Sequence, residues 1–376
     1  MVTGIDVISD IVANLPDIFY SEGQRLWNRE AQLVSKVRKN MGRGPGVFWT
    51  VSNGGSTTVV RGEGFTVTPA TDSFQDDRVM LNLNRGIYSN TFGFTDQELA
   101  TVASYAGTDA AADMIKERLK DAYLEGLSAI SRKIELDCLT GTGTQNDPSS
   151  NPQNCIVGLL GALKTAGSYG GQALVSNAGL VSNVQTGVGN ITRADIDLIF
   201  AQIQQATGSS PTFIMASPKT CTYLKGIADD QVRYNVIGNS VAQREIGGLS
   251  MPIQSMGPSV MSYDGVPIYS NSAWGASTSS SLAANADGYV VFGQERHLLI
   301  DCLPYGPAPD ALISQMRTSL SSNGDGVSDA GLPVRCWAQA KTAASLVVTM
   351  DLQVQLAVLK PNAFGLMTGV TGFTKS

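Results

Sequence analysis

The feature that most restricts the fold of this sequence is a β-rich stretch without lysine that leads directly into a long amphipathic helix. No lysine occurs between Lys39 and Lys116, and residues 56–93 alternate Val, Thr, Leu, Asn and Arg with turn residues. This alternation predicts an extended β-hairpin over residues 56–94. The segment that follows, 111–138, predicts a helix about 40 Å long at about 1.5 Å per residue, a structural strut. Its apolar residues recur at helical spacing: Ala111, Ile115, Leu119, Ala122, Gly126, Ile130 and Ile134.

The composition favours a protein of broad surface contacts. The 376 residues suggest two or three domains. Only 15% of the residues are charged, so much of the surface consists of Ser, Thr, Asn, Gln and bare backbone. The net charge of -6 argues against a dedicated DNA reader, because such domains usually carry a basic surface.

The cysteines and apolar runs indicate a soluble chain synthesised in a reducing compartment. Five widely spaced cysteines, an odd number without a C-x-x-C pair, argue against disulfides and zinc. The apolar stripe near residues 5–15 is interrupted by Asp6 and Asp10 and lacks a basic leader, so we do not expect a signal peptide. No run approaches the roughly 20 apolar residues that span a bilayer. Cytoplasmic synthesis is the expectation.

The order of helices and strands predicts an α+β protein with discontinuous domains. A basic helix is expected over about 23–40, and a helix capped by Thr192 precedes an apolar strand at 212–216. Long alternating runs over 332–359 predict an elongated antiparallel element that Pro361 ends.

Catalytic motifs are missing from the sequence. The single histidine, His297, has no G-x-S-x-G elbow or H-E-x-x-H motif to complete a triad or a metal site. A surface or loop histidine is the favoured interpretation, and a hydrolase using His297 stays a distant alternative. We therefore expect no enzyme activity, no cofactor and no metal.

Two charged groups are candidate contact sites. The first is a basic N-terminal stretch, which could neutralise phosphates of DNA or contact acidic neighbours in an assembly, and both interpretations stay open. It comprises Arg25, Arg29, Lys36, Arg38, Lys39 and Arg43. The second is a mixed-charge strip on the hairpin that would suit salt bridges between subunits, although exposure alone also explains it. It comprises Arg61, Asp76, Asp77, Arg78 and Arg85.

The order of these segments resembles the major capsid protein of tailed bacteriophages, with the Hong Kong 97-type fold. The phrases Tyr263-Asp-Gly-Val-Pro-Ile-Tyr269 and Pro361-Asn-Ala-Phe364 look like the axial-domain strand and the terminal turn of that family. The resemblance implies four parts: an N-terminal arm (1–55), an extended loop (56–94), a peripheral domain (95–191 and 310–360) that includes the spine helix (111–138), and an axial domain (192–309, with 361–376 possibly returning to it).

The resemblance further implies self-assembly into the hexamers and pentamers of an icosahedral phage head around double-stranded DNA. The loop would then lie across a neighbouring subunit, which would cover Val79, Leu81 and Leu83. A separate scaffolding protein and a portal are implied partners, and a decoration protein is left open. Location in the virion after assembly in the host cytoplasm is implied as well.

The chain departs from the covalent cross-linking seen in some members of that family. Their isopeptide bond joins a loop lysine to an asparagine with the help of a glutamate. Here the loop has no lysine and no glutamate follows Glu295, although Asn362 could act as the acceptor. A non-covalent shell is therefore expected. An encapsulin-like nanocompartment shell is the alternative within the same fold, and the long N-terminal arm favours the phage.

Overall fold

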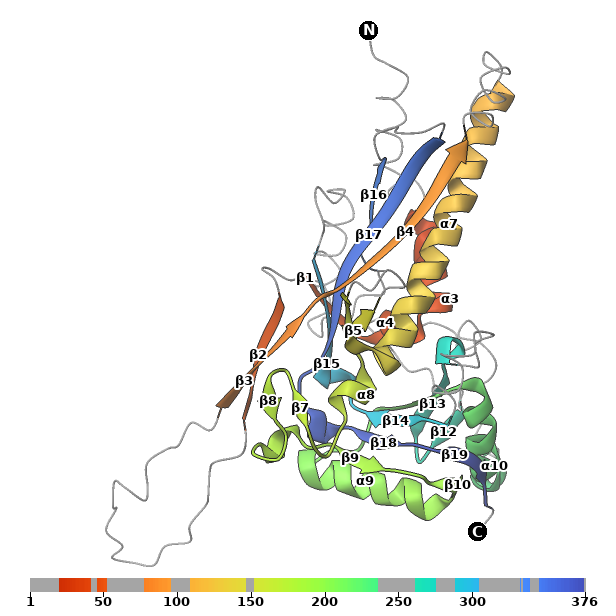
Figure 1. Ribbon diagram of the computed structural model, residues 1–376. Helices are drawn as coiled ribbons and strands as arrows, with labels where there is room; N and C mark the ends of the chain where they lie inside the picture. Colours follow the sequence, from red (N-terminus) through yellow and green to blue (C-terminus); the bar gives the residue numbers. More distant parts are fainter. Residues whose placement is uncertain are drawn as a thin grey trace, which may run out of the picture.

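The computed structural model describes residues 20–41, 46–52, 78–95, 109–146, 152–235, 261–274, 288–303, 332, 334–338 and 345–374. The molecule is elongated, with the long helix α7 (Asp109–Thr140) and two long strands at one end and a compact α/β region at the other (Figure 1). The α+β class predicted from the sequence is confirmed.

A five-stranded sheet packs against α7 along its length. Its central strand, β17 (Ser345–Val358), pairs with β4 (Gly86–Thr95) along one edge. The other edge of β17 is shared by β15 (Leu298–Leu303) and β16 (Arg335–Ala338), and β1 (Arg38–Met41) runs parallel to β15. The buried face carries Tyr88, Val348, Met350, Leu352 and Val354.

Close contact between α7 and this sheet depends on a small residue. A Cβ atom added to Gly126 would lie 2.8 Å from the sulfur of Met350. A larger residue at this position would therefore have to displace the side chain of Met350. The helix itself begins two residues before and ends two residues after the predicted 111–138.

A six-stranded sheet forms the compact end of the molecule. Its order is β12 (Met261–Tyr263), β13 (Val266–Ser270), β11 (Phe213–Ala216), β14 (Val290–Gly293), β18 (Gly365–Met367) and β9 (Asn183–Gln185). Every residue of β11 and β14 is buried, as in a sheet covered on both faces.

Two helices and the C-terminus complete this region. Helix α9 (Arg193–Thr207) begins with a capping box in which Thr192 and Asp195 exchange hydrogen bonds, as the sequence indicates for Thr192. Helix α10 (Pro218–Asn235) follows β11. After the short helix η6 (Pro361–Ala363), the chain adds β18 to the sheet and then pairs β19 (Val370–Phe373) with β10 (Gly189–Ile191). Residues 361–374 thus lie in the compact region.

The predicted hairpin of 56–94 has different partners in the structure. Its last strand, β4, belongs to the five-stranded sheet, because Tyr88 and Phe92 point toward the apolar side chains beneath it. The paired arms are β2 (Gly46–Ser52) and β3 (Arg78–Asn84), so the hairpin begins about ten residues earlier than predicted. Residues 53–77 lie outside the described part.

Two further predictions need correction. The basic helix expected over 23–40 is two helices, α3 (Tyr20–Glu30) and α4 (Gln32–Lys36), and the remainder is strand β1, because its backbone pairs with β15. The boundaries predicted for the axial part, 192–309, also differ from the structure. Strand β9 joins the six-stranded sheet and β10 pairs with β19, although both strands precede residue 192. Strand β15 lies within 192–309 but joins the five-stranded sheet.

Candidate functional site

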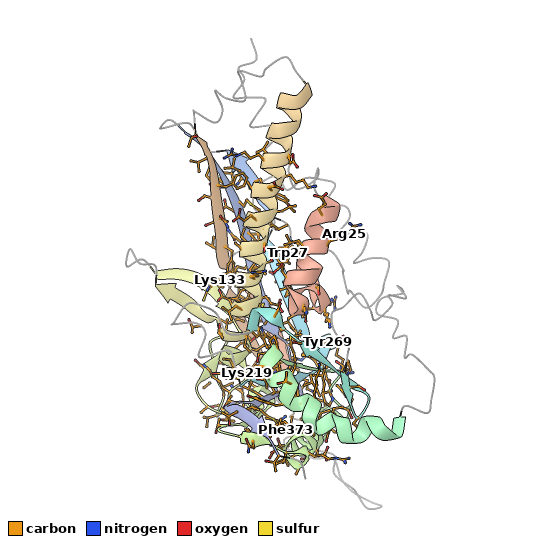
Figure 2. All side chains as sticks on the ribbon, turned by 90° about the vertical axis from the view of Figure 1, so that its right-hand side faces the viewer. Arg25, Trp27, Lys133, Lys219, Tyr269 and Phe373 are labelled. Atoms are coloured by element: carbon orange, nitrogen blue, oxygen red, sulfur yellow. The ribbon has the colours of Figure 1, made fainter. Side chains whose placement is uncertain are left out.

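The N-terminal helices pack on the spine helix of their own chain. Helix α3 runs alongside α7 (Figure 2) and buries Leu26 and Trp27 in the main core. Two ion pairs flank these apolar contacts: Lys120 Nζ lies 2.6 Å from Glu22 Oε1, and Arg132 pairs with Glu30. This segment is therefore part of the subunit's body.

A buried carboxylate on α7 joins three separate segments. The N-cap residue of helix α4 is Ala31, whose side chain cannot accept the hydrogen bonds of the first helical amides. Glu135 supplies the missing acceptor: Leu33 N donates to its Oε1 at 2.6 Å and Val34 N to its Oε2 at 3.1 Å. Asn271, after β13, donates its side-chain amide to the same carboxylate.

The surroundings of Glu135 strongly affect its ionisation. The side chain is fully buried, and burial raises its pKa to about 7. The three hydrogen-bond donors and the nearby Lys36 ammonium lower the pKa, but their effect is smaller than that of burial. Trp274 Nε1, in helix η3 (Ser272–Trp274), donates to the backbone carbonyl of Glu135 at 3.1 Å. This single helical turn therefore fixes the arm, the spine and the six-stranded sheet relative to one another.

A buried ion pair anchors the base of the hairpin. Arg85 lies between β3 and β4, and its Nε and Nη2 donate to Asp301 Oδ2 on β15 at 2.8 and 2.5 Å. Asn40 on β1 donates to Asp301 Oδ1 at 2.9 Å. The pKa of Asp301 is raised, because desolvation outweighs the stabilising Arg85 and Asn40. The pair therefore fixes the direction in which the hairpin leaves the sheet.

A third polar cluster connects β4 with α7 and β6 (Pro152–Val157). Tyr88 Oη donates to Asp137 Oδ2 at 2.8 Å and accepts from Ile156 N at 3.2 Å. Lys133 Nζ lies 2.9 Å from Asp137 Oδ1. Burial and Asp137 raise the pKa of Tyr88, so the phenol stays neutral and donates. All three clusters hold elements at fixed positions.

The hairpin residues predicted to contact another subunit divide into two groups. Leu81, Leu83 and Arg85 are 0%, 7% and 4% exposed, so they pack inside their own chain and the prediction is wrong for them. Their side of β3 faces the short hairpin β7 (Ser168–Tyr169) and β8 (Gln172–Ala173), where Asn82 N donates to Gly170 O. Arg78 is exposed and Val79 half-buried. Arg61, Asp76 and Asp77 lie outside the described residues.

The basic N-terminal residues also separate by burial. Lys36 and Lys39 are 9% and 0% exposed, so they cannot touch DNA, contrary to one of the two interpretations. Lys39 is buried because it lies within β1, opposite Ile300 of β15. Arg25 and Arg38 are exposed, which leaves both interpretations open for them. The side-chain environment of Arg29, and all of Arg43, lie outside what the structure describes.

The single histidine has no catalytic surroundings among the described residues. His297 ends helix η5 (Glu295–His297), and its neighbours Arg296 and Lys360 are cationic. Burial, aided by these charges, lowers its pKa to about 4, so it is neutral at pH 7. In the described ranges no three His, Cys, Asp or Glu side chains gather into a metal-binding group. Among the described helices, none combines the length and apolar content needed to cross a membrane.

The sequence did not reveal Glu135, Asn271 or Asp301 as organising residues. One signal was available for Glu135, because it shares a helical face with Ser131, Cys138 and Leu139, all buried. A carboxylate within such a stripe indicates a buried partner from elsewhere. Nothing in the sequence identifies that partner as the amides of α4.

A long spine helix lies on a sheet, with a hairpin at one side and an α/β region at its end. This architecture is the Hong Kong 97-type capsid fold. The capsid asymmetric unit of cyanophage A-1(L) matches it with a TM-score of 0.60 and 15% identity, over 91% of this chain and 93% of that one. The holo-SrpI encapsulin complex of Synechococcus elongatus gives a TM-score of 0.48 and 14% identity, over 92% and 90%. The structure of Gordonia phage Cozz gives 0.48 and 13%, over 91% and 87%.

The sequence itself assigns the family. The model of the SU10 major capsid protein family matches residues 55–255, more than half of the chain. This chain therefore belongs to the SU10 major capsid protein family, a family of phage capsid proteins. No curated protein sequence matches it.

Proposed function

We propose that the chain assembles into hexamers and pentamers, which form the icosahedral head of a tailed phage around double-stranded DNA. The observation that carries this proposal is the family match over 55–255, which contains strands β3 and β4, the spine helix and part of the six-stranded sheet. The shell is held by packing and salt bridges. Assembly takes place in the host cytoplasm with a separate scaffolding protein and a portal.

The described contacts suit such a building block. The three buried polar clusters fix hairpin, spine and both sheets in one geometry, which a closed shell of identical subunits needs. The outer face of the β2–β3 hairpin exposes Phe48 and Met80, although its inner face is packed. Two-stranded ribbons are marginal alone in water, so a neighbouring subunit would stabilise this one.

Negative-stain electron microscopy of the purified chain, with and without co-expressed scaffolding protein, tests the assembly. Closed shells of uniform diameter with hexameric and pentameric units are expected. Discrete monomers or dimers under every condition would contradict the proposal. Nuclease-resistant double-stranded DNA in particles from infected cells separates a phage head from the alternative, an encapsulin-like shell, which would enclose protein instead.

DNA contact by the arm is proposed only for its exposed arginines, and only as sequence-independent binding. Replacing Arg25 and Arg38 by alanine removes two exposed cations without touching the buried Lys36 and Lys39. Genome retention in the variant should be weaker than in the wild type at low salt and should fall less steeply as salt rises, because fewer counterions are released per chain. Identical retention at all salt concentrations would assign these arginines to protein contacts.

A further inference from the structure

One exposed arginine is held in place by uncharged groups. Arg296 lies in helix η5, where the chain passes from β14 to β15. Its Nε and Nη2 donate to Gln294 Oε1 at 3.2 and 3.0 Å, and Nη2 also donates to Ser209 Oγ at 2.9 Å. In the part of the chain that the structure describes, Nη1 has no hydrogen-bond partner. Its two N–H groups and the positive charge are therefore available to a ligand.

The support beneath Arg296 is buried and hydrogen-bonded. Gln294 is 0% exposed, and its Nε2 donates to Thr207 Oγ1 at 3.0 Å and to Ser209 O at 2.9 Å, at the end of α9. The amide cannot turn over without losing these bonds, so its carbonyl oxygen stays directed at Arg296. The guanidinium is thus positioned before any ligand arrives, and a preorganised group loses less conformational entropy on binding.

A lysine and the single histidine lie beside Arg296. The end of β17 brings Lys360 next to His297, because Leu359 N donates to His297 O at 2.8 Å. Burial lowers the pKa of His297, and the nearby charges of Arg296 and Lys360 lower it further. In the ranges 204–212, 293–299 and 357–376 the sequence has one carboxylate, that of Glu295. On a chain with a net charge of -6, this surface is therefore locally positive.

Such a group of side chains suits a phosphate. A phosphate presents several acceptor oxygens, which an arginine fork and a lysine point charge can share. A carboxylate has only two oxygens, and the fork alone would satisfy them. We propose that Arg296, Lys360 and His297 form a binding site for a phosphate group. In an assembled shell its occupant is a backbone phosphate of the enclosed DNA, bound without regard to sequence, and this part of the inference rests on the proposed function.

Binding to the unassembled full-length chain tests the site. The probes are inorganic phosphate, glutamate as a carboxylate, and a short fluorescent DNA duplex. Arg296→Gln and Lys360→Gln each remove one cation from the site. The matched control is Lys219→Gln, which removes the same charge from an exposed position of α10. Circular dichroism melting checks the fold of each variant. Because His297 is the only histidine, the NMR signal of its ring Cε1–H reports on this site alone.

We expect phosphate, and not glutamate, to shift the His297 signal in the wild type and in Lys219→Gln, and the shift to be lost in both site variants. Each site variant should also bind the duplex several-fold more weakly than the control at low salt. The slope of log K against log salt should be smaller by about 0.9 in each, as for the loss of one phosphate contact.

A His297 signal that does not respond to phosphate would overturn the site. An equal response to glutamate would also overturn it and would assign these cations to a carboxylate-bearing partner. If phosphate shifts the signal but the site variants bind the duplex like the control, the site exists and DNA is not its occupant. Chains that never assemble would refute the proposed function and leave the phosphate result standing, so the two failures can be told apart.

Discussion

Arg85 and Asp301 show how single residues determine the shape of this subunit. Both side chains are 2% exposed and lie 216 positions apart in sequence, yet they form a double hydrogen bond. A buried pair of this kind adds little net stability over apolar residues. Any other arrangement of the strands would leave a buried charge without its partner, which is strongly destabilising. The value of the pair here is geometric, because it fixes the point where the chain passes from the β2–β3 hairpin into β4 of the five-stranded sheet.

Arg85→Met should destabilise the subunit by about 3–5 kcal/mol, because it leaves Asp301 buried without its cation. Urea unfolding of unassembled chains measures this. Adding Asp301→Leu to the same chain should restore at least half of the loss, since no buried charge remains. The exposed Arg78→Ala is the control and should change stability by less than about 1 kcal/mol. Equal effects at both arginines would refute the buried-pair argument.

Glu135 makes stability depend on pH in an unusual direction for a carboxylate. Its pKa is about 7 in the folded chain against 4.5 for the exposed group, so the folded state holds the proton more tightly. The carboxyl imposes no penalty below about pH 4.5, and its penalty grows as pH rises and levels off above about 7. Relative to Glu135→Gln, the wild type should therefore lose on the order of 3 kcal/mol across this window.

Urea unfolding of both chains at several pH values from 4.5 to 8 checks this difference. The pH dependence of the difference in free energy of unfolding isolates Glu135, since both chains share every other titrating group. A difference that stays constant with pH would show that Glu135 titrates normally in the fold.

At the scale of elements, the β7–β8 turn supports the hairpin through two adjacent glycines that differ in one respect. Gly170 and Gly171 have φ angles of 57° and 83°, so both favour glycine. A Cβ on Gly170 would lie 2.8 Å from the Cβ of Leu81 on β3, whereas one on Gly171 meets nothing within 4 Å. Only the first glycine is needed for the close approach of the two hairpins.

Gly170→Ala should therefore cost more than Gly171→Ala, by about 1–3 kcal/mol, the range for overpacking a close contact. Limited proteolysis gives a second readout, since cleavage within 46–84 should accelerate in the first variant alone. Indistinguishable variants would mean that backbone conformation and not contact with Leu81 decides the role of Gly170.

Sequence periodicity correctly predicted the elements that have strong local patterns. It failed where an element packs against residues that are distant in the sequence. The spine helix and the Thr192 cap were predictable, because their apolar spacing and capping residues are local. Strand β4 was predicted as a strand but assigned to a hairpin, since alternation reveals a face and not a neighbour. For the same reason Leu81 and Leu83 were predicted as contacts with another subunit. Their apolar partners lie near Tyr169, about 90 residues later, and no pattern indicates that.

At the scale of the whole molecule, the chain separates rigid support from surface contact. The buried polar clusters lie at the junctions of spine, arm and sheets, and the β2–β3 hairpin, with Phe48 and Met80 exposed, projects at one side. A shell built from such chains would depend on apolar and polar packing more than on charge. Assembly should accordingly respond less to salt than an assembly held by ion pairs.

The distribution of lysine leads to a prediction about the finished shell. Residues 40–115 contain no lysine, and Lys39 is fully buried in β1, so the hairpin has no amine to form an isopeptide bond with a neighbour. Purified particles heated in SDS with reductant should therefore migrate as single chains, and mass spectrometry should find no species heavier than one chain. A parallel sample without reductant identifies disulfides, which are not expected because all five thiols are buried. Multimers that persist with reductant would contradict a non-covalent shell and direct the search to lysines beyond the hairpin.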